Sequence, residues 1–347
     1  MFSRQFLIWT MVLGLTLAIL SGFATKAPAA ERVALTMFGS PLGSDAHNFA
    51  HALGDIINKN HPWLRVSVLE TMGSVDNIKS LSDLSPDKRK LHISLSVDGV
   101  LEMSLRGDGP FKKTGPITGW RVLCSLYTAS PHFMTLDPNI KGPKDMTGKR
   151  IGLPPKGHGL SKCALFYLDS CWDLLGKVKV INMPTAMAKD ALLDGTIDVC
   201  TAGGMFFSEN EFKTSPFNEA ILAARKNVYY IGITKEEYER GKAKIPTDPH
   251  IWALVKANAL RPGYPDKDSG ILRLALTWVA WEDMDEKLAY EIVKTAGEND
   301  HKFKEYFAAG KAAKAENFVA NAWSEKRYHP GALRYYKEKA LTLQGKL

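Results

Sequence analysis

The sequence predicts an α/β protein with two lobes, each a mostly parallel sheet covered by helices, joined by two crossing segments. Three observations support this fold class: strands and helices alternate, the alternation restarts at Arg150, and two long apolar segments lie at residues 120–136 and 271–281. Residues 31–124 and 276–347 are predicted to form lobe 1. Residues 125–275 are predicted to form lobe 2, inserted between the two crossings.

The first part of the chain alternates between short apolar strands and amphipathic helices. Strands are predicted at residues 33–37, 66–68 and 91–97. The helix after the first strand ends before His61-Pro62, and its apolar face consists of Phe49, Ala52, Leu53, Ile56 and Ile57. The next helix is predicted to have Ser74 as its N-cap, and its apolar positions are Val75, Ile78, Leu81 and Leu84. Residues 107–119, rich in glycine and proline, predict a loop.

The second part repeats the alternation after the first crossing. One helix, stopped by Gly176, is predicted from the apolar positions Ala164, Leu165, Leu168, Trp172 and Leu175. Strands follow at residues 178–181, 197–201 and 227–233, with a helix at 185–193. After the second crossing the chain is expected to be largely helical from Asp285 onward.

The N-terminal segment has the pattern of an export signal. Arg4 precedes an apolar run at residues 6–20, and small residues follow at 27–30. A retained membrane anchor is the alternative, but the run is shorter than the roughly 20 apolar residues that a bilayer span needs. We therefore expect residues 1–30 to be a signal peptide, cleaved after Ala29 or Ala30, and the mature protein to be periplasmic.

Charge and cysteine spacing restrict the partners and the cross-links. Removal of Arg4 and Lys26 lowers the formal charge from +8 to +6, and the remaining basic residues are spread along the chain. Together with export, this spread of charge argues against a nucleic-acid partner, and a mildly basic surface suits an anionic ligand. The protein is expected to be a monomer.

The four cysteines are expected to be free and buried. Cys163 and Cys171 lie eight residues apart on one predicted helix. That spacing separates their Cα atoms by about 12 Å, beyond the roughly 7 Å that a disulfide tolerates. Cys124 and Cys200 lie in predicted strands, and a disulfide between them stays open.

Glycine-rich turns before helices are the strongest functional feature. Residues 70–77 (ETMGSVDN) and 149–161 (KRIGLPPKGHGLS) each predict a strand, a turn and a helix start, where unpaired backbone N–H groups attract anions. The candidate ligand-binding residues are Ser40, Ser44, His47, Gly73, Ser74, Asn77, Asp98, Tyr127, Gly157, His158, Gly159, Gly203 and Gly204. Helix capping, tight turns or close packing are the alternative explanations for the glycines, Ser74 and Asn77.

Individual side chains add further candidates. His158 can donate a hydrogen bond when neutral and would gain charge near pH 6.5, or it is simply an exposed loop histidine. Asp98 follows a buried strand, so it can face a ligand or only begin the next turn. Tyr127 lies in the first crossing, where aromatic residues also belong to the core.

The sequence predicts neither metal nor cofactor binding. His47, His51 and Asp55 recur every four residues, but the helix face that carries them is expected to point to solvent. We find no nucleophile elbow, phosphate-binding loop or dinucleotide fingerprint, so an enzyme is not expected.

The order of motifs resembles the TAXI family of solute-binding proteins, the receptors of TRAP transporters. The resemblance spans nearly all of the mature chain and rests on residues 70–77, 145–152 (DMTGKRIG), 194–204 (DGTIDVCTAGG) and 329–338 (HPGALRYYKE). Two loops depart from the family pattern, residues 39–47 (GSPLGSDAH) instead of G-G-x-Y-Y, and residues 157–160 (GHGL) instead of G-S-G-T.

The resemblance implies a type II periplasmic-binding-protein fold and a receptor that hands its ligand to a TRAP-type permease. The implied ligands are small organic anions: dicarboxylates, oxo-acids or acidic amino acids. An ABC-type receptor for a sulfonate-like anion is an alternative, since D-x-x-G-K-x-I-G also occurs there. A two-lobed enzyme that uses His158 and Asp98 as acid and base is a further alternative.

Overall fold

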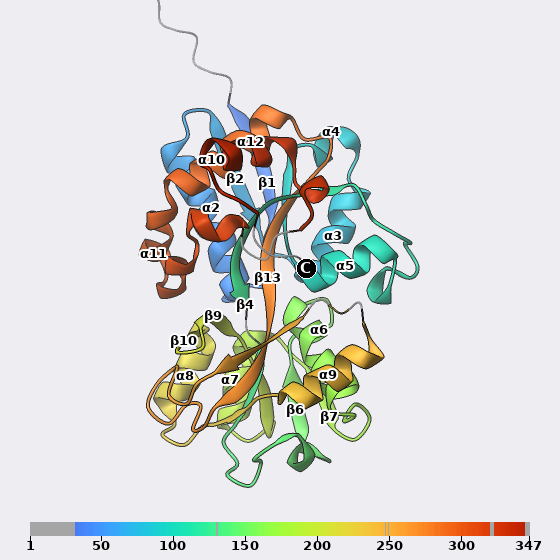
Figure 1. Ribbon diagram of the computed structural model, residues 1–347, viewed down its shortest axis with the longest axis vertical. Coiled ribbons are helices and arrows are strands. Elements are labelled where there is room, and N and C mark those ends of the chain that lie inside the picture. Colours follow the sequence, from blue (N-terminus) through green and yellow to red (C-terminus); the bar gives the residue numbers. More distant parts are fainter. Residues whose placement is uncertain (1–31, 130, 247, 249, 320–322, 344–347) are drawn as a thin grey trace, which may run out of the picture. The chain divides into compact units, whose positions relative to one another are not determined.

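A computed structural model describes residues 32–343 of the chain, except residues 130, 247, 249 and 320–322 (Figure 1). The chain divides into two compact units, Met1–Val33 and Ala34–Leu347, and the elements below lie in the second apart from the first residue of β1. The predicted signal peptide, residues 1–30, lies outside the described residues. Within them, no helix combines the length and apolar character that crossing a bilayer requires.

Two mixed sheets form the framework of the described residues. The strands of the first sheet are β1 (Val33–Phe38), β2 (Leu64–Leu69), β3 (His92–Val97), β4 (Trp120–Ala129), β9 (Gly204–Ser208), β10 (Glu211–Thr214), β12 (Ile251–Val255) and β13 (Ser269–Trp281). Their order is β10-β9-β4-β13-β3-β1-β2, and β12 pairs with β13. The strands of the second sheet, in spatial order, are β11 (Tyr229–Ile231), β5 (His132–Thr135), β8 (Val199–Ala202), β6 (Arg150–Leu153) and β7 (Lys179–Asn182).

Both sheets contain a parallel centre and antiparallel additions. β1 and β3 run parallel, as do β6, β7 and β8, because helices connect these strands. β13 runs antiparallel to β3 and β4, and β5 runs antiparallel to β8 and β11. The sheets are therefore mixed rather than mostly parallel, since the crossing strands enter from the opposite direction.

The second crossing is one continuous strand, β13, whereas the residues of the first are divided between β4 and β5. β13 pairs with β12 over its first residues, 269–273, and with β4 over residues 274–281. In Figure 1 it extends as one long strand between the groups of helices. The two predicted crossings and the two-lobed fold class are confirmed, whereas the lobe boundaries stay predictions.

The helices flank the sheets at the predicted places. Their bounds are α2 Asp45–Asn60, α3 Ser74–Asp83, α4 Pro86–Arg89, α5 Asp98–Arg106, α6 Gly159–Leu165, α7 Thr185–Leu193, α8 Pro216–Ala224, α9 Lys235–Lys244, α10 Glu286–Glu298, α11 Phe303–Tyr306 and α12 Pro330–Glu338. Short 3₁₀ turns occupy Gly109–Phe111, Pro143–Met146, Asp300–Lys302, Ala308–Ala312, Ala315–Val319 and Glu325–Arg327. The apolar face predicted for α2 is fully buried.

Some details of the helices differ from the sequence prediction. Gly73, with φ of 107°, is the N-cap of α3, and Ser74 is its first helical residue, because only glycine readily adopts that backbone angle. α6 continues into a π-helix at Phe166–Cys171, so the predicted helix ends before Leu175, which is 45% exposed. α5, α8 and α9 were not predicted, and of these only α9 is polar with weak apolar periodicity.

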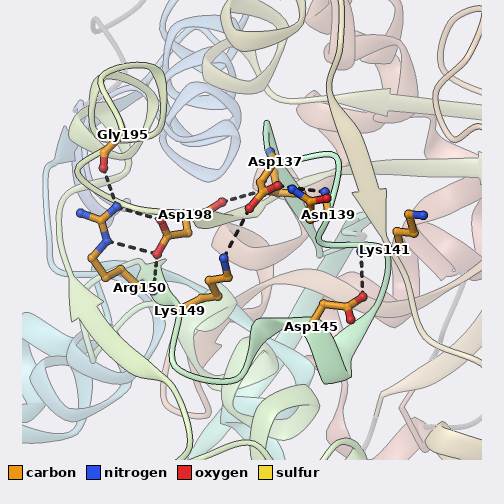
Figure 2. A network of polar contacts seen from close by, with 9 residues as sticks. Asp137, Asn139, Lys141, Asp145, Lys149, Arg150, Gly195 and Asp198 are labelled. Carbon is orange, nitrogen blue, oxygen red and sulfur yellow. Dashed lines mark hydrogen bonds and ion pairs between the residues drawn. The ribbon is translucent and has the colours of Figure 1, made fainter.

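A polar network joins two of the motifs that carry the family resemblance, residues 145–152 and 194–204 (Figure 2). Arg150 donates to Asp198 through its backbone N–H at 2.7 Å and through its guanidinium at 2.8 and 3.1 Å. Asp145 accepts from the backbone N–H groups of Lys141 and Gly142 and so caps the turn before β6. These motif residues therefore hold strands and turns together, and their contacts explain the motif without a ligand.

All four cysteines are buried and none forms a disulfide, as the sequence prediction had it. Burial raises the pKa of the Cys124, Cys163, Cys171 and Cys200 thiols. The thiols therefore stay protonated at neutral pH; at Cys163, His250 favours the thiolate, but the effect of burial is larger.

Candidate ligand-binding site

A cavity of about 60 Å³ lies where loops of the two sheets meet. Val97, Leu274 and Leu276 contribute apolar surface from the first sheet. Its polar lining residues are Ser40, Ser44, Asp45, Ser74, His158, Thr185, Thr201, Ser215 and Asn218. Gly159, Gly203 and Gly204 also line it, so seven of the predicted ligand residues come together: Ser40, Ser44, Ser74, His158, Gly159, Gly203 and Gly204.

Helix N-termini surround this cavity. Among the described elements, α2, α3, α6, α7 and α8 each place a residue of their cap or first turn in the lining. First-turn N–H groups lack intrahelical acceptors and carry partial positive charge. The described lining contains neither lysine nor arginine. The site can thus hold an anion by backbone dipoles alone.

Close contacts between loops of the two sheets enclose the cavity. The N–H of Val75 donates to the carbonyl of Gly157 at 3.2 Å. A β-carbon on Gly159 would lie 2.8 Å from Cγ2 of Val97 and 3.2 Å from the Ser74 hydroxyl, so this approach needs glycine. A β-carbon on Gly43 would collide with the ring of Phe217. The loop before α2 therefore packs directly against α8.

The serine loop before α2 is held in place by its own polar contacts. The Ser44 hydroxyl donates to the carbonyl of Pro41 at 2.7 Å and accepts from the N–H of His47 at 3.2 Å. Nδ1 of His47 lies 2.8 Å from the carbonyl oxygen of Ser40 and donates to it. His47 does not line the cavity. It positions the loop that does.

His158 presents a hydrogen-bond donor to the cavity. It is the N-cap of α6, and its Nδ1 accepts from the N–H of Leu160 at 3.1 Å. The proton of the neutral ring is therefore on Nε2, which is buried and has no partner. Burial lowers the pKa of His158 to about 4. The expected gain of charge near pH 6.5 is thus wrong, and the ring acts as a neutral donor.

Asp45 is the most unusual group of the site, and sequence reasoning missed it. The residue is 9% exposed and lines the cavity, and its Oδ1 is buried without a hydrogen-bond partner. Burial raises the pKa of Asp45 from 3.8 to about 7. An acidic residue in the first turn of a helix is commonplace, so the sequence carried no signal of its burial.

α7 and α8 supply further lining residues that the sequence prediction did not contain. The Thr185 hydroxyl is buried without a partner. The side-chain amide of Asn218 donates to the carbonyl of Gly203 at 3.0 Å, and the N–H of Ser215 donates to the same oxygen at 2.9 Å. The backbone of the glycine pair is therefore fixed by α8, and Gly203 serves both packing and lining.

The other predicted ligand residues lie outside the cavity lining. The Asn77 amide is fully buried and donates to the carbonyls of Gly39 and Leu95 at 2.7 Å each, which ties β1 to β3. Both oxygens of Asp98 accept backbone N–H groups, from Gly99 and Ala275, at 2.8 Å. We therefore assign Asn77 and Asp98 a structural role in place of the predicted ligand contact.

Gly73 and Gly157 border the site without lining it. A β-carbon on Gly73 would lie 3.4 Å from Cα of His158, so this cap packs against the α6 loop. The Gly157 carbonyl accepts from Val75, as above. Tyr127 lies in β4 opposite Leu276, and its side chain is outside the described part of the structure.

The helix face that resembled a metal site has another role. Asp55 accepts from the Lys59 ammonium at 2.6 Å and from the Tyr306 hydroxyl at 2.5 Å, which joins α2 to α11. Within the described residues, no group of three or more histidine, cysteine or acidic side chains is arranged to hold a metal ion.

Comparison with known proteins places these features in a wider group. The NMT1-like family matches residues 41–340 of the chain. MatC from Rhodopseudomonas palustris, solved with bound malate, is similar in structure with a TM-score of 0.52 and 9% identity, covering 89% of this chain and 96% of that one. A protein from Bordetella bronchiseptica gives a TM-score of 0.50 and 13% identity, covering 89% and 98%. The periplasmic binding protein BugD gives 0.48 and 15%, covering 90% and 99%.

Proposed function

Because this chain belongs to the NMT1-like family and has the periplasmic-binding-protein fold, we propose that it is a periplasmic receptor for a small organic anion. The ligand is held in the cavity between the sheets and released to a membrane permease. The observation that carries this proposal is the convergence of helix N-termini on a cavity whose described lining has no basic side chain. Such a site binds a carboxylate and has no group arranged to transform it.

The contacts of Asp98 and His158 do not support the alternative that the protein is an enzyme using these two residues as acid and base. Asp98 already accepts two backbone N–H groups, and His158 uses Nδ1 to cap α6. With a pKa of about 4, His158 is a poor general base or acid near neutral pH. Binding is the chemistry that these groups favour.

Three finer points belong to the same proposal. The partner is a TRAP-type permease, as the motif resemblance implies, and the protein reaches the periplasm through cleavage after residue 29 or 30. The ligand class comprises dicarboxylates, oxo-acids and acidic amino acids. MatC with malate is an example of this fold holding a small organic acid.

A thermal-shift screen tests the receptor function directly. A ligand that binds only the folded state stabilises it by about 2.7 kcal/mol at a concentration 100 times its Kd. We expect a clear rise of the melting temperature with at least one small carboxylate, and none with matched amines or alcohols without a carboxylate. A flat response to a broad panel of small organic anions, including sulfonates, would defeat the proposal.

A further inference from the structure

We infer that the ligand of this site carries a protonated nitrogen beside its carboxylate, and that Asp45 binds that nitrogen. This inference rests on the proposed receptor function and narrows its ligand class. Simple dicarboxylates and oxo-acids become poorer ligands than amine-bearing carboxylates. Asp45 is then the residue that determines specificity.

The first step is the isolation of the Asp45 carboxyl. It belongs to the first turn of α2, whose Ser44 hydroxyl is engaged by Pro41 and His47. No ion pair connects Asp45 to a basic side chain among the described residues, and none of the residues lining the cavity is lysine or arginine. Oδ1 of Asp45 is therefore a buried acceptor without a donor.

Comparison with Asp98 shows why the missing hydrogen-bond partner of Asp45 is unusual. Asp98 is fully buried, and burial raises its pKa to about 7 as well. However, both of its oxygens receive backbone N–H groups, so the fold itself satisfies it. The fold supplies no such donor to Oδ1 of Asp45. A buried polar group left without a partner destabilises the folded protein, and a charged one does so more strongly.

The second step is the distribution of donors and acceptors around the cavity. His158 offers an N–H through Nε2, and first-turn N–H groups of the surrounding helices add more donors. These groups suit the carboxylate of a ligand. Among the described residues of the lining, Asp45 is the only one with an acidic side chain, and it suits a donor with positive charge.

The third step is the charge balance of the occupied site. An ammonium group of the ligand would pair with Asp45 and offset the cost of its burial. A second carboxylate in that place would meet a like charge, which disfavours it unless Asp45 takes up a proton. A zwitterion therefore offers partners both to Asp45 and to the donors of the cavity, whereas a dianion places a second negative charge beside Asp45.

Titration calorimetry at pH 8 tests this with two matched sets of compounds, alanine, lactate and propionate, and glutamate, 2-hydroxyglutarate and glutarate. In at least one set we expect the amine to bind tenfold or more tightly than its hydroxy and unsubstituted analogues. Asp45→Asn should remove that preference, while Asp98→Asn, which changes a buried acid outside the cavity, should keep it. Thermal unfolding of each variant confirms that it is folded.

The outcomes separate this inference from the function on which it rests. If hydroxy acids or dicarboxylates bind as tightly as the amines, and Asp45→Asn does not alter their ratio, the inference is overturned and the receptor function stands. If none of the six compounds binds and the wider anion panel is also silent, the receptor function fails and the inference fails with it.

Discussion

Replacing Asp45 by asparagine should make the ligand-free protein more stable, and more so at alkaline pH. The substitution keeps the size of the side chain and removes a carboxyl whose pKa burial raises from 3.8 to about 7. Because the folded-state pKa is the higher one, the stabilising contribution of the protonated group is fully present below about pH 4. It is lost as the pH rises through about 7.

The size of the effect follows from these two values. Each pKa unit corresponds to about 1.36 kcal/mol, so ionising Asp45 in the folded protein costs up to roughly 4 kcal/mol. At pH 5 the folded-state carboxyl is still protonated and only about a third of this cost applies. Between pH 5 and pH 8 the advantage of Asp45→Asn should therefore grow by roughly 2–3 kcal/mol.

Urea unfolding at pH 5 and pH 8 measures this difference, provided that the denaturant slope is the same for both proteins. Asp98 titrates in the wild-type and the variant alike, so the difference between the two curves isolates Asp45. An equal stability difference at both pH values, or a variant less stable than wild type at pH 8, would refute the reasoning about an isolated buried carboxyl.

Three further predictions concern the neighbouring groups. His158→Asn keeps a side chain that can cap α6 but removes the Nε2 donor, so the ligand affinity measured by calorimetry should fall roughly 5- to 150-fold, the effect of 1–3 kcal/mol. The fall should be the same at pH 6 and pH 8, because the pKa of His158 is about 4. A loss of affinity that depends on pH would contradict this. Gly159→Ala should weaken ligand binding about tenfold, because the added methyl group pushes against Val97. The double substitution with Val97→Ala should restore the affinity. If it does not, the contact between Gly159 and Val97 does not control ligand binding. Asn77→Ala should lower the free energy of unfolding by about 2–3 kcal/mol, because the carbonyls of Gly39 and Leu95 lose their hydrogen-bond donor. The ratio of affinities within a ligand set should not change. A changed ratio would indicate that Asn77 contributes to ligand binding.

Local patterns predicted much of the fold because they act over a few residues. The buried stripe of α2 follows from helical spacing, and the glycine turns follow from their backbone angles, as at Gly73. The second crossing was predictable from an apolar run that β13 buries on both faces. These features do not depend on where distant segments lie.

The rest of the site depends on contacts between residues far apart in the chain. Asp45 is closed in by α8, whose Phe217 packs against the loop of Gly43 more than 170 residues earlier in the sequence. No local pattern announces such burial. Asn77 shows the opposite error, since a motif shared with receptors suggested a ligand contact while its amide in fact bridges two strands.

A crystal structure of the protein with the tightest compound of the matched sets tests the central claim most directly. We predict the carboxylate within hydrogen-bond distance of His158 Nε2 and of first-turn N–H groups around the cavity, with the nitrogen on Asp45. A ligand bound elsewhere, or one whose carboxylate is held by lysine or arginine side chains, would contradict the claim that helix N-termini form the binding site.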